Sequence, residues 1–428
     1  MSNNIEQLYE HFIKSGGVVS TDSRTIEKGA IFFALKGDRF DGNKYALEVL
    51  KKWAAFAVVD SDEVPDGPKI FRVDNVLKAL QELARLHRNA LDIPIIAITG
   101  SNGKTTTKEL LYAVLSQKYK VHATLGNLNN HIGVPLTILS SSLDLDILIV
   151  EMGANHIGDI AELCGIADPS YGLITNIGYA HLEGFGSLDG VKQGKTELYR
   201  YLKGRNGTVF YNENDELLVS EVPKKMFSHP YIDWLKVKSG RTFLEIAADG
   251  DHWKSSHLVG NYNAINMICA ATVGQFFDVS QNQIIDAISE YIPTNNRSQI
   301  VNVGPYNLIM DAYNANPSSM KESISSFAAM KSDLGKILLI GDMAELGADS
   351  HDLHRSVIDH LEKYKWEQVY LVGSQFAMAD SLNQYHKIDQ AEDLLDPKLK
   401  IQEILKDKIV LIKASRSMRL EQIKTLIR

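Results

Sequence analysis

The chain has 428 residues, a length that predicts about two to four domains. Its 44% apolar and 23% charged content is typical of a globular protein, and its net charge of −8 argues against a general nucleic-acid binder. No apolar run reaches the ~18–20 residues of a membrane span, and the segment 1–17 does not resemble a secretory signal. Cys164 and Cys269 follow no metal-ligand spacing. We therefore expect a cytoplasmic protein with no membrane insertion and no nucleic-acid partner, and we also expect a monomer.

The first part of the chain, residues 1–90, predicts a small α/β domain. Three short apolar runs, separated by turn signals such as Asp41-Gly42, are typical of strands. A helix is expected at about 74–90, and Ile93-Pro94 follows as a plausible boundary. The expected strands lie at 30–35, 54–60 and 69–73.

The second part, residues 91–297, alternates apolar runs with amphipathic segments. This alternation predicts a mainly parallel sheet that is covered by helices on both faces. Strands are expected at 93–99, 146–153, 171–177 and 207–212, helices at 104–118, 156–165, 188–203 and 261–277, and extra strands or a hairpin at 228–238 and 241–247.

The third part, residues 298–428, repeats the same alternation and predicts a Rossmann-like, doubly wound domain. Strands are expected at 307–313, 336–342, 368–373 and 408–415, and helices at 317–330, 350–364, 392–406 and 416–427. The fold class predicted for the whole chain is therefore α/β, with three domains.

The segment 93–107, IPIIAITGSNGKTTT, is the most informative in the sequence. A buried strand ends in a glycine-rich turn, and a helix begins at Lys104, which is the order of a phosphate-binding loop. Two residues separate its glycines instead of the usual four, so a chance match is the alternative. The residues expected to bind nucleotide are Gly100, Ser101, Asn102, Gly103, Lys104, Thr105 and Thr106.

Glu151 ends the next strong strand after this loop. An acid at the carboxyl end of a strand in a nucleotide-binding sheet can hold Mg²⁺ beside the loop hydroxyl, here that of Thr105. The alternative is a solvated acid at a strand end.

The roles of several polar residues cannot be decided from their chemistry alone. His181 in a glycine-rich loop is more often structural than a ligand, and Lys195 has an equally placed rival in Lys192, one helical turn earlier. Asp311 at a strand end can accept from ribose hydroxyls, but its segment also carries the helix-start signals Pro317 and Ser318, so the alternative is that it only leads into a helix. The amides of Asn127, Asn129 and Asn130 either form turns or bind a polar substrate above the sheet.

Together these motifs resemble the Mur ligase family, the ATP-dependent amide-forming enzymes of bacterial cell-wall precursor synthesis. The resemblance covers nearly the whole chain. It rests on the order of TGSNGKTTT (99–107), GNLNNHIGVPLT (126–137), VEMGANHIGDI (150–160), AHLEGFGS (180–187), KTELY (195–199), NYNAIN (261–266), NNRSQ (295–299), DAYNANPSSM (311–320), GDMAELG (341–347) and KASRSM (413–418).

Within the family, EMGANH, AHLEGFGS, DAYNANP and GDMAELG resemble the branch that joins D-alanyl-D-alanine to UDP-N-acetylmuramoyl-tripeptide. The D-N-P-R segment of the branch that adds meso-diaminopimelate is missing. The resemblance implies a UDP-sugar-binding domain over 1–90, an ATP-binding domain over 91–297, and a domain over 298–428 that closes over ATP and the incoming dipeptide. It implies an acyl phosphate intermediate, with ATP and Mg²⁺ as cofactors.

The resemblance also implies roles for particular residues. Thr105, Glu151, His181 and a carbamylated Lys195 would hold metal ions, with Lys104 among the catalytic groups. Tyr262 stands where relatives often have histidine, which weakens the expected adenine contact. Asn263, Asn266, Arg297, Asp311 and Tyr313 are then expected at ATP, and Ser23, Arg24, Asn127, Asn129, Asn130, Asn314, Lys413, Ser415 and Arg416 at the other substrates.

Three alternatives remain at this point. The chain resembles other amino-acid-adding ligases of the same family and the folate polyglutamylating relatives, which differ in the amino acceptor. A phosphate-loop nucleotide switch is a third possibility, but it leaves the third domain without a task.

Overall fold

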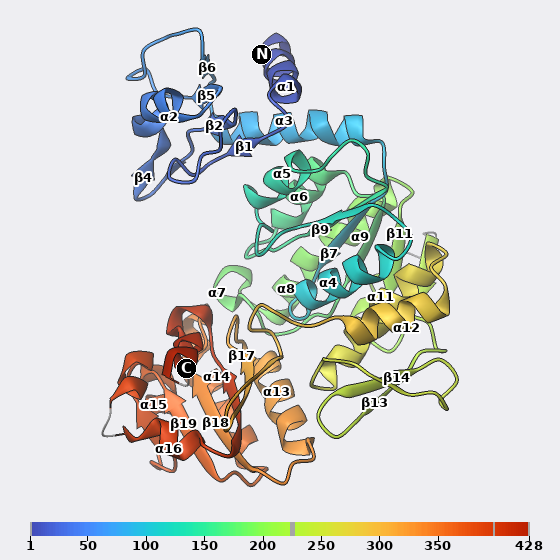
Figure 1. Ribbon diagram of the computed structural model, residues 1–428, viewed down its shortest axis with the longest axis vertical. Helices are drawn as coiled ribbons and strands as arrows, with labels where there is room; N and C mark the ends of the chain where they lie inside the picture. Colours follow the sequence, from blue (N-terminus) through green and yellow to red (C-terminus); the bar gives the residue numbers. More distant parts are fainter. Residues whose placement is uncertain (1, 223–226, 397–398, 427–428) are drawn as a thin grey trace.

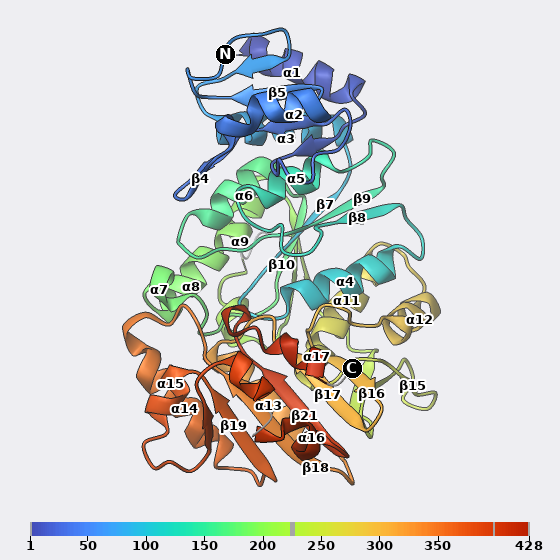
Figure 2. The same ribbon diagram turned by 60° about the vertical axis from the view of Figure 1, so that its left-hand side comes forward.

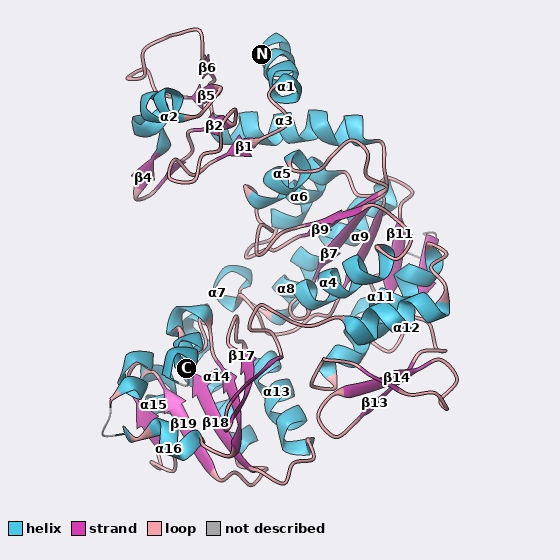
Figure 3. Ribbon diagram, viewed as in Figure 1, coloured by secondary structure: helices cyan, strands magenta, loops and turns pink. Residues whose placement is uncertain are grey.

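The computed structural model describes residues 2–222, 227–396 and 399–426, which form three successive sheet-containing regions (Figure 1). The N-terminal region lies at one end, the region with the central sheet in the middle, and the C-terminal region at the other end (Figures 1 and 2). The α/β character predicted from the sequence is confirmed, since helices and mostly parallel strands alternate along the chain (Figure 3).

The N-terminal region is a four-stranded parallel sheet in the order β1-β2-β5-β6. Alternate residues of its strands face opposite sides: Phe33 and Val58 pack with helices α1 and α3, and Phe32 and Val59 pack with α2. Its elements are α1 (Ser2–Lys14), β1 (Val19–Ser20), β2 (Ile31–Phe33), β3 (Lys36–Gly37), β4 (Phe40–Asp41), α2 (Ala46–Lys52), β5 (Phe56–Val59), β6 (Ile70–Arg72) and α3 (Val76–Leu91).

The central region is a six-stranded parallel sheet in the order β12-β11-β10-β7-β9-β8. Its strands are β7 (Ile95–Thr99), β8 (Val121–Ala123), β9 (Ile147–Glu151), β10 (Tyr171–Ile174), β11 (Thr208–Tyr211) and β12 (Phe227–Pro230), and a small antiparallel sheet follows with β13 (Lys236–Ser239), β14 (Leu244–Ala247) and β15 (Lys254–Ser255).

Helices cover both faces of the central sheet. Ile96 and Ile98 of β7 pack toward α4 and α11, whereas Ile95 and Ala97 pack toward α3 and α5. The helices are α4 (Lys104–Leu115), α5 (Gly133–Leu139), α6 (Asp159–Ala167), α7 (Leu182–Phe185), α8 (Leu188–Lys195), α9 (Glu197–Gly204), α10 (Glu216–Val219), α11 (Tyr262–Phe276) and α12 (Gln281–Glu290).

The C-terminal region has a six-stranded sheet in the order β16-β17-β21-β18-β19-β20, parallel except for the edge strand β16. Its strands are β16 (Gln299–Val303), β17 (Tyr306–Asp311), β18 (Gly335–Gly341), β19 (Gln368–Val372), β20 (His386–Ile388) and β21 (Lys408–Lys413). Apolar clusters fill both faces, one with α13 (Pro317–Ala329), α14 (Ser350–Leu361) and α15 (Ser374–Ala379), the other with α16 (Ile401–Leu405) and α17 (Ile423–Leu426).

Some expected helices differ from the structure. The helix expected at 188–203 is divided at Thr196 into α8 and α9. The helix expected at 392–406 is wrong, because only a 3₁₀ turn (Ala391–Leu395) and α16 form, with 397–398 outside the described residues. The single helix expected at 416–427 is also wrong: two 3₁₀ turns precede α17, and residue 427 is not described. Among the described helices, α1, α2, α5, α7, α10, α12 and α15 were not predicted.

The C-terminal region touches the phosphate-binding loop directly. Asn316, which caps α13, donates from Nδ2 to Asn102 Oδ1 at 2.7 Å, and the Tyr179 amide donates to Ser318 Oγ at 3.3 Å. These contacts place two regions that are far apart in sequence around one cleft. In the described part of the chain, no helix has the length and apolar character needed to span a bilayer.

Candidate active site

The turn after β7 is held in place by the loop that follows the neighbouring strand β10. The Ser101 amide donates to Asn176 O, the Asn102 amide donates to Asn176 Oδ1, both at 3.0 Å, and Ser101 Oγ donates to Gly178 O. The turn then enters α4 directly, so the unpaired amides of the first helical turn face the cleft. This geometry suits an anion such as a phosphate.

Gly100 and Gly103 are needed by this turn. Both have positive φ, 141° and 80°, where a side chain is disfavoured. A Cβ on Gly100 would lie 2.0 Å from Thr175 Oγ1, and one on Gly103 would lie 2.7 Å from Asn266 Oδ1. Thr175 and Asn266 of the same chain therefore lie so close to the loop that no residue with a side chain could replace either glycine.

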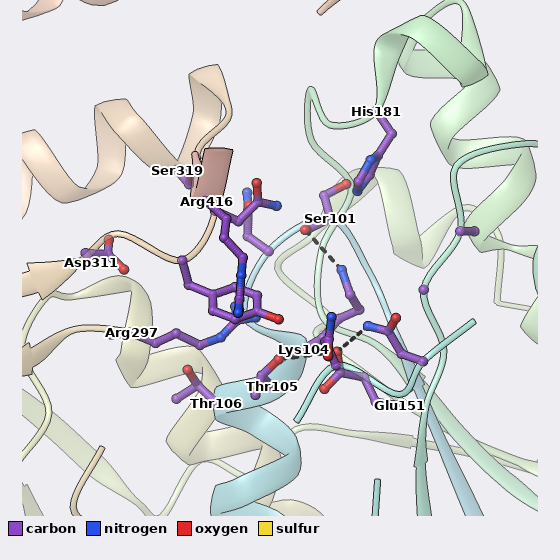
Figure 4. A pocket seen from close by; sticks show the side chains of 18 of the residues that line it. Ser101, Lys104, Thr105, Thr106, Glu151, His181, Arg297, Asp311, Ser319 and Arg416 are labelled. Atoms are coloured by element: carbon purple, nitrogen blue, oxygen red, sulfur yellow. Dashed lines mark hydrogen bonds between the residues drawn. The ribbon is translucent and has the colours of Figure 1, made fainter. Parts of the chain in front are cut away.

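Lys104 lies folded over the loop. Its Nζ donates to the carbonyl oxygens of Gly100 at 2.6 Å and Ser101 at 3.3 Å (Figure 4). Loss of solvation lowers its pKa to about 8, although the charge of Glu151 opposes this shift. The ammonium group is thus held against the loop carbonyl oxygens in the cleft, where a bound anion would stabilise its charge.

Glu151 ends β9 inside the same cleft. Its Oε1 accepts from Thr105 Oγ1 at 3.3 Å and from Asn129 Nδ2 at 2.8 Å. Its Oε2 is buried without a hydrogen-bond partner, and the nearest cation, Lys108 Nζ, lies 3.8 Å away. Lys108 is itself buried and was not singled out from the sequence.

These oxygens fit a magnesium ion. A buried carboxylate oxygen without a hydrogen bond, beside a threonine hydroxyl, offers the hard ligands that Mg²⁺ prefers. Three or more His, Cys, Asp or Glu side chains do not gather into a metal cluster anywhere in the described ranges. Phosphate oxygens and water would have to complete the coordination.

The three asparagines of loop 127–130 all line the cleft but differ in what they do. Asn129 orients Glu151, as described above. Asn130 Oδ1 accepts from the amides of Ile132 and Gly133 and so fixes the start of α5. Asn127 lines the wall without a side-chain hydrogen bond to another described residue.

The structure distinguishes Lys192 from Lys195, which the sequence could not do, because it places them in different environments. Lys192 Nζ pairs with Glu221 at 2.9 Å on the surface. Lys195 is fully buried, donates to Ala154 O at 3.1 Å and lies over the Phe185 ring. Burial, together with the charge of Lys104, holds the pKa of Lys195 well below its usual value. Lys195 itself does not line the cleft, whereas Ala154, which accepts its hydrogen bond, does.

His181 points into the cleft from the loop before α7 (Figure 4). Its Nδ1 forms an ion-pair contact with Glu345, which belongs to the C-terminal region. Hydrogen bonding to His181 lowers the pKa of Glu345. Glu345 was not named from the sequence, although the motif GDMAELG that carries it was.

The opposite wall carries two arginines around one aromatic ring. The guanidinium carbons of Arg297 and Arg416 lie 3.9 Å and 5.0 Å from the centre of the Tyr313 ring. Arg297 Nε is buried without a hydrogen-bond partner. The two arginines reach into the cleft from the side facing Lys104 (Figure 4), so this wall offers positive charge to an anion.

Asp311 is engaged by its own region. Its Oδ2 accepts from Lys413 Nζ at 2.7 Å and from Ser323 Oγ at 2.8 Å. Burial would raise the pKa of Asp311, but the Lys413 charge and these hydrogen bonds outweigh it, and the pKa lies below its usual value. Asp311 therefore enters the cleft as a carboxylate paired with Lys413.

Tyr262 and two asparagines connect α11 with this region. Tyr262 OH is hydrogen-bonded to Ser298 Oγ at 2.7 Å, and Asn263 donates to Val259 O and Ser298 Oγ. Asn266 donates to Asn263 Oδ1 and accepts from Thr107 Oγ1. All three line the cleft, yet their polar groups are largely used within the protein.

The remaining expected residues divide into two groups. Thr106 and Asn314 line the cleft. Ser415 donates to Asp342 O at 2.6 Å and is buried, so it supports the fold. Ser23 and Arg24 lie in the N-terminal region, where the exposed Arg24 pairs with Asp22. The structure thus does not bring these last three residues to the cleft wall.

Together these groups enclose a polar cleft of about 650 Å³ between the central and C-terminal regions. The cleft combines a phosphate-binding loop, a carboxylate at a strand end and two facing arginines. On a three-region α/β chain, this combination defines a nucleotide-dependent enzyme whose central and C-terminal regions meet over the phosphate site.

Comparisons with known proteins agree with this class. Residues 17–88 match the model "Mur ligase family, catalytic domain", 98–274 match "Mur ligase middle domain", and 296–416 match "Mur ligase, glutamate ligase domain". The chain belongs to the Mur ligase family.

Two relatives and two solved structures illustrate the similarity. The UDP-N-acetylmuramoyl-tripeptide–D-alanyl-D-alanine ligases of Bacillus subtilis and Escherichia coli are 32% and 31% identical, over 97% and 95% of this chain and 93% and 92% of theirs. MurF from Acinetobacter baumannii superposes with a TM-score of 0.85 at 26% identity, covering 96% of this chain and 92% of that one. MurF ligase from Thermotoga maritima in complex with ADP gives 0.83 at 28% identity, with 96% of both chains covered.

Proposed function

We propose that this chain joins D-alanyl-D-alanine to UDP-N-acetylmuramoyl-tripeptide at the expense of ATP, in peptidoglycan precursor synthesis. The observation that carries the proposal is the cleft itself, with Lys104, Glu151 and Thr105 on one wall and Arg297 and Arg416 on the other. The similarity to D-alanyl-D-alanine ligases over nearly the whole chain supplies the substrates.

The chemistry requires an activated carboxylate, because amide formation in water is uphill. The tripeptide carboxylate attacks the γ-phosphorus of ATP, the bond to ADP breaks, and an acyl phosphate forms. The amine of the dipeptide then attacks the acyl carbon, loses a proton, and phosphate leaves. Lys104 and the α4 amides stabilise charge on the phosphoryl oxygens, and closure of the cleft excludes water from the acyl phosphate.

Magnesium, when bound, would neutralise phosphate charge beside the loop. The oxygens of Thr105 and Glu151 are the groups that would hold it, and Asn129 keeps the carboxylate turned toward the cleft. Lys108 balances part of the carboxylate charge from behind.

Lys195 is proposed to be carbamylated. A lowered pKa leaves the amine neutral, and a neutral amine can attack CO₂, forming an N–C bond and releasing a proton. The product is a carbamate, whose negative charge lies on oxygen, at a site where burial disfavours an ammonium group. With His181 it would serve a second metal ion.

The other substrates are assigned by region. Ser23 and Arg24 would bind the UDP-sugar on the N-terminal domain, for which we propose 1–90, with 91–297 and 298–428 as the other two domains. Asn127 and Asn314 face the cleft and would contact the tripeptide or the dipeptide. Every proposed group comes from one chain, so we propose a monomer, acting in the cytoplasm where ATP is available.

The decisive experiment supplies ATP, Mg²⁺, D-alanyl-D-alanine and UDP-N-acetylmuramoyl-tripeptide, with lysine or diaminopimelate as third residue, and weighs the product. We expect a mass increase equal to D-alanyl-D-alanine minus water, with equal ADP release. Replacing the dipeptide by D-alanine, glutamate or meso-diaminopimelate should stop both. Product with a single amino acid, or ATP hydrolysis indifferent to muramyl peptide, would contradict the proposal.

A further inference from the structure

His181 and Glu345 share an uncommon backbone conformation. Their φ angles are 53° and 62°, in the left-handed region that residues with side chains avoid. One lies in the central region and the other in the C-terminal region, and their side chains meet. Both sides of this contact thus carry a sparsely populated backbone conformation.

The loop that carries Glu345 is fixed to the C-terminal region by the residues just before Glu345. The Asp342 carboxylate accepts from the amides of Gln375 and Phe376, and Ser415 Oγ donates to Asp342 O. The fully buried His354 accepts from the Met343 amide at 3.0 Å. Glu345 is therefore presented at a fixed place and moves only with its whole region.

The Glu345 carboxylate contacts His181 Nδ1, which is buried and forms no hydrogen bond of good geometry to Glu345 or to any other described residue. A second contact, from the Glu183 amide to Glu345 O at 3.3 Å, joins the same loops, and α7 packs against the turn Gly347–Asp349. Both views place α7 beside the C-terminal region (Figures 1 and 2).

A neutral imidazole carries one N–H and one lone pair, so a carboxylate at Nδ1 selects the Nδ1–H tautomer. The Nε2 lone pair is then free, and the ring of His181 points into the cleft (Figure 4). A carboxylate behind a histidine is the usual arrangement for a histidine that binds a metal through its other nitrogen.

We propose that Glu345 is a positioning residue that sets the tautomer and orientation of His181 when the C-terminal region docks on the central region. His181 then presents Nε2 to the cleft only in the docked arrangement. The inference deepens the proposed function, because it assigns the last step in assembling that site to a residue from another domain.

The test is the tautomer of His181, read from long-range ¹⁵N–¹H NMR of the ¹⁵N-histidine-labelled full chain, with and without ADP and Mg²⁺. The signal is assigned by its loss in His181→Asn. In wild type we expect the Nδ1–H tautomer, more fully populated with ADP and Mg²⁺. In Glu345→Ala we expect a shift toward the Nε2–H tautomer, and in Glu345→Gln a partial shift.

Glu183→Ala is the matched control, since Glu183 is an exposed carboxylate two residues from His181. We expect it to leave the tautomer unchanged. In ligase assays, Glu345→Ala should lower kcat by about 10–100-fold with less effect on the KM for ATP.

An unchanged His181 tautomer in Glu345→Ala would overturn the inference, as would an equal shift in Glu183→Ala. Because the tautomer is measured without turnover, this result is independent of the substrate assignment. If product forms but the tautomer does not respond to Glu345, only this inference fails.

Discussion

The two walls of the cleft are built in different ways. The central wall is already assembled: Ser101, Asn102, Thr105 and Glu151 are each tied to neighbours within the same sheet. The opposite wall presents Arg297, from the segment before β16, and Arg416, from the C-terminal region, on a shared tyrosine. It meets the loop through single contacts such as Asn316–Asn102. The preassembled wall suits charge stabilisation, whereas the opposite wall suits closure.

The strongest test of this contrast removes the charge of the preassembled wall. Lys104→Met keeps the side-chain length but leaves no cation at the phosphoryl group, and we expect kcat/KM to fall by about 10³-fold. Steady-state ADP release, with thermal unfolding to check the fold, measures this. A loss below tenfold would place the stabilising charge elsewhere.

The second test compares Lys195 with Lys192 and asks which of the two is needed for activity. We expect Lys195→Ala to lower kcat by about 10²-fold and small carboxylates to restore part of it, because they can replace a carbamate oxygen. Lys192→Ala removes an equally spaced lysine that pairs with Glu221 on the surface, and it should retain activity. Similar losses in both variants would remove the special role of Lys195.

The distinction between these lysines marks the limit of sequence reasoning here. The buried central strands, the glycine turn after β7 and the position of Glu151 at a strand end were predictable, because buried parallel strands and glycine turns leave local patterns. The short strands β1, β8, β16 and β20 were not predicted. Lys195 and Lys192 share one helix, and only packing separates them. Glu345 was missed because its partner His181 lies in another region of the chain.

Two errors in the secondary-structure prediction also have local physical causes. Helix α5 was missed because Gly133 and Pro135 signal a break, yet proline is tolerated in a first helical turn. The helix expected at 416–427 was wrong because Arg419 adopts a left-handed conformation between two 3₁₀ turns. Neither feature is visible in apolar periodicity.

On the wall that carries the two arginines we expect a smaller effect. Arg416→Ala should raise the KM for ATP by about tenfold, since Arg297 still supplies charge beside Tyr313. Arg416→Lys should lose less, because it keeps the charge but not the planar stacking. Arg419→Lys, an exposed neighbour, is the control. A 10³-fold loss in Arg416→Ala would show that this wall also drives the chemistry.

The smallest expected effect is a change in the pH dependence of stability, and it arises away from the cleft, where α3 meets α1. His87 is buried, with Nδ1 near Tyr9 OH and Nε2 near Ser141 O. Burial lowers its pKa below 6.5, although the contact with Ser141 opposes this shift. The unfolded chain therefore binds the proton more readily, and stability should be lost as pH falls below about 6.5.

For one such group the slope is at most about 1.4 kcal/mol per pH unit. Urea unfolding at pH 7.5 and 5.5 should show a smaller pH dependence in His87→Gln than in wild type. Equal pH dependence in the two proteins would exclude His87 as its source.

Helix α3 has a further consequence. Its buried face belongs to one apolar cluster that includes Phe12 and Phe33 of the N-terminal region together with Val134 and Leu148 of the central region. Since no solvent layer divides that cluster, calorimetry should record these two regions melting in one cooperative transition. The shared apolar core then fixes the relative placement of these two regions without a bound cofactor.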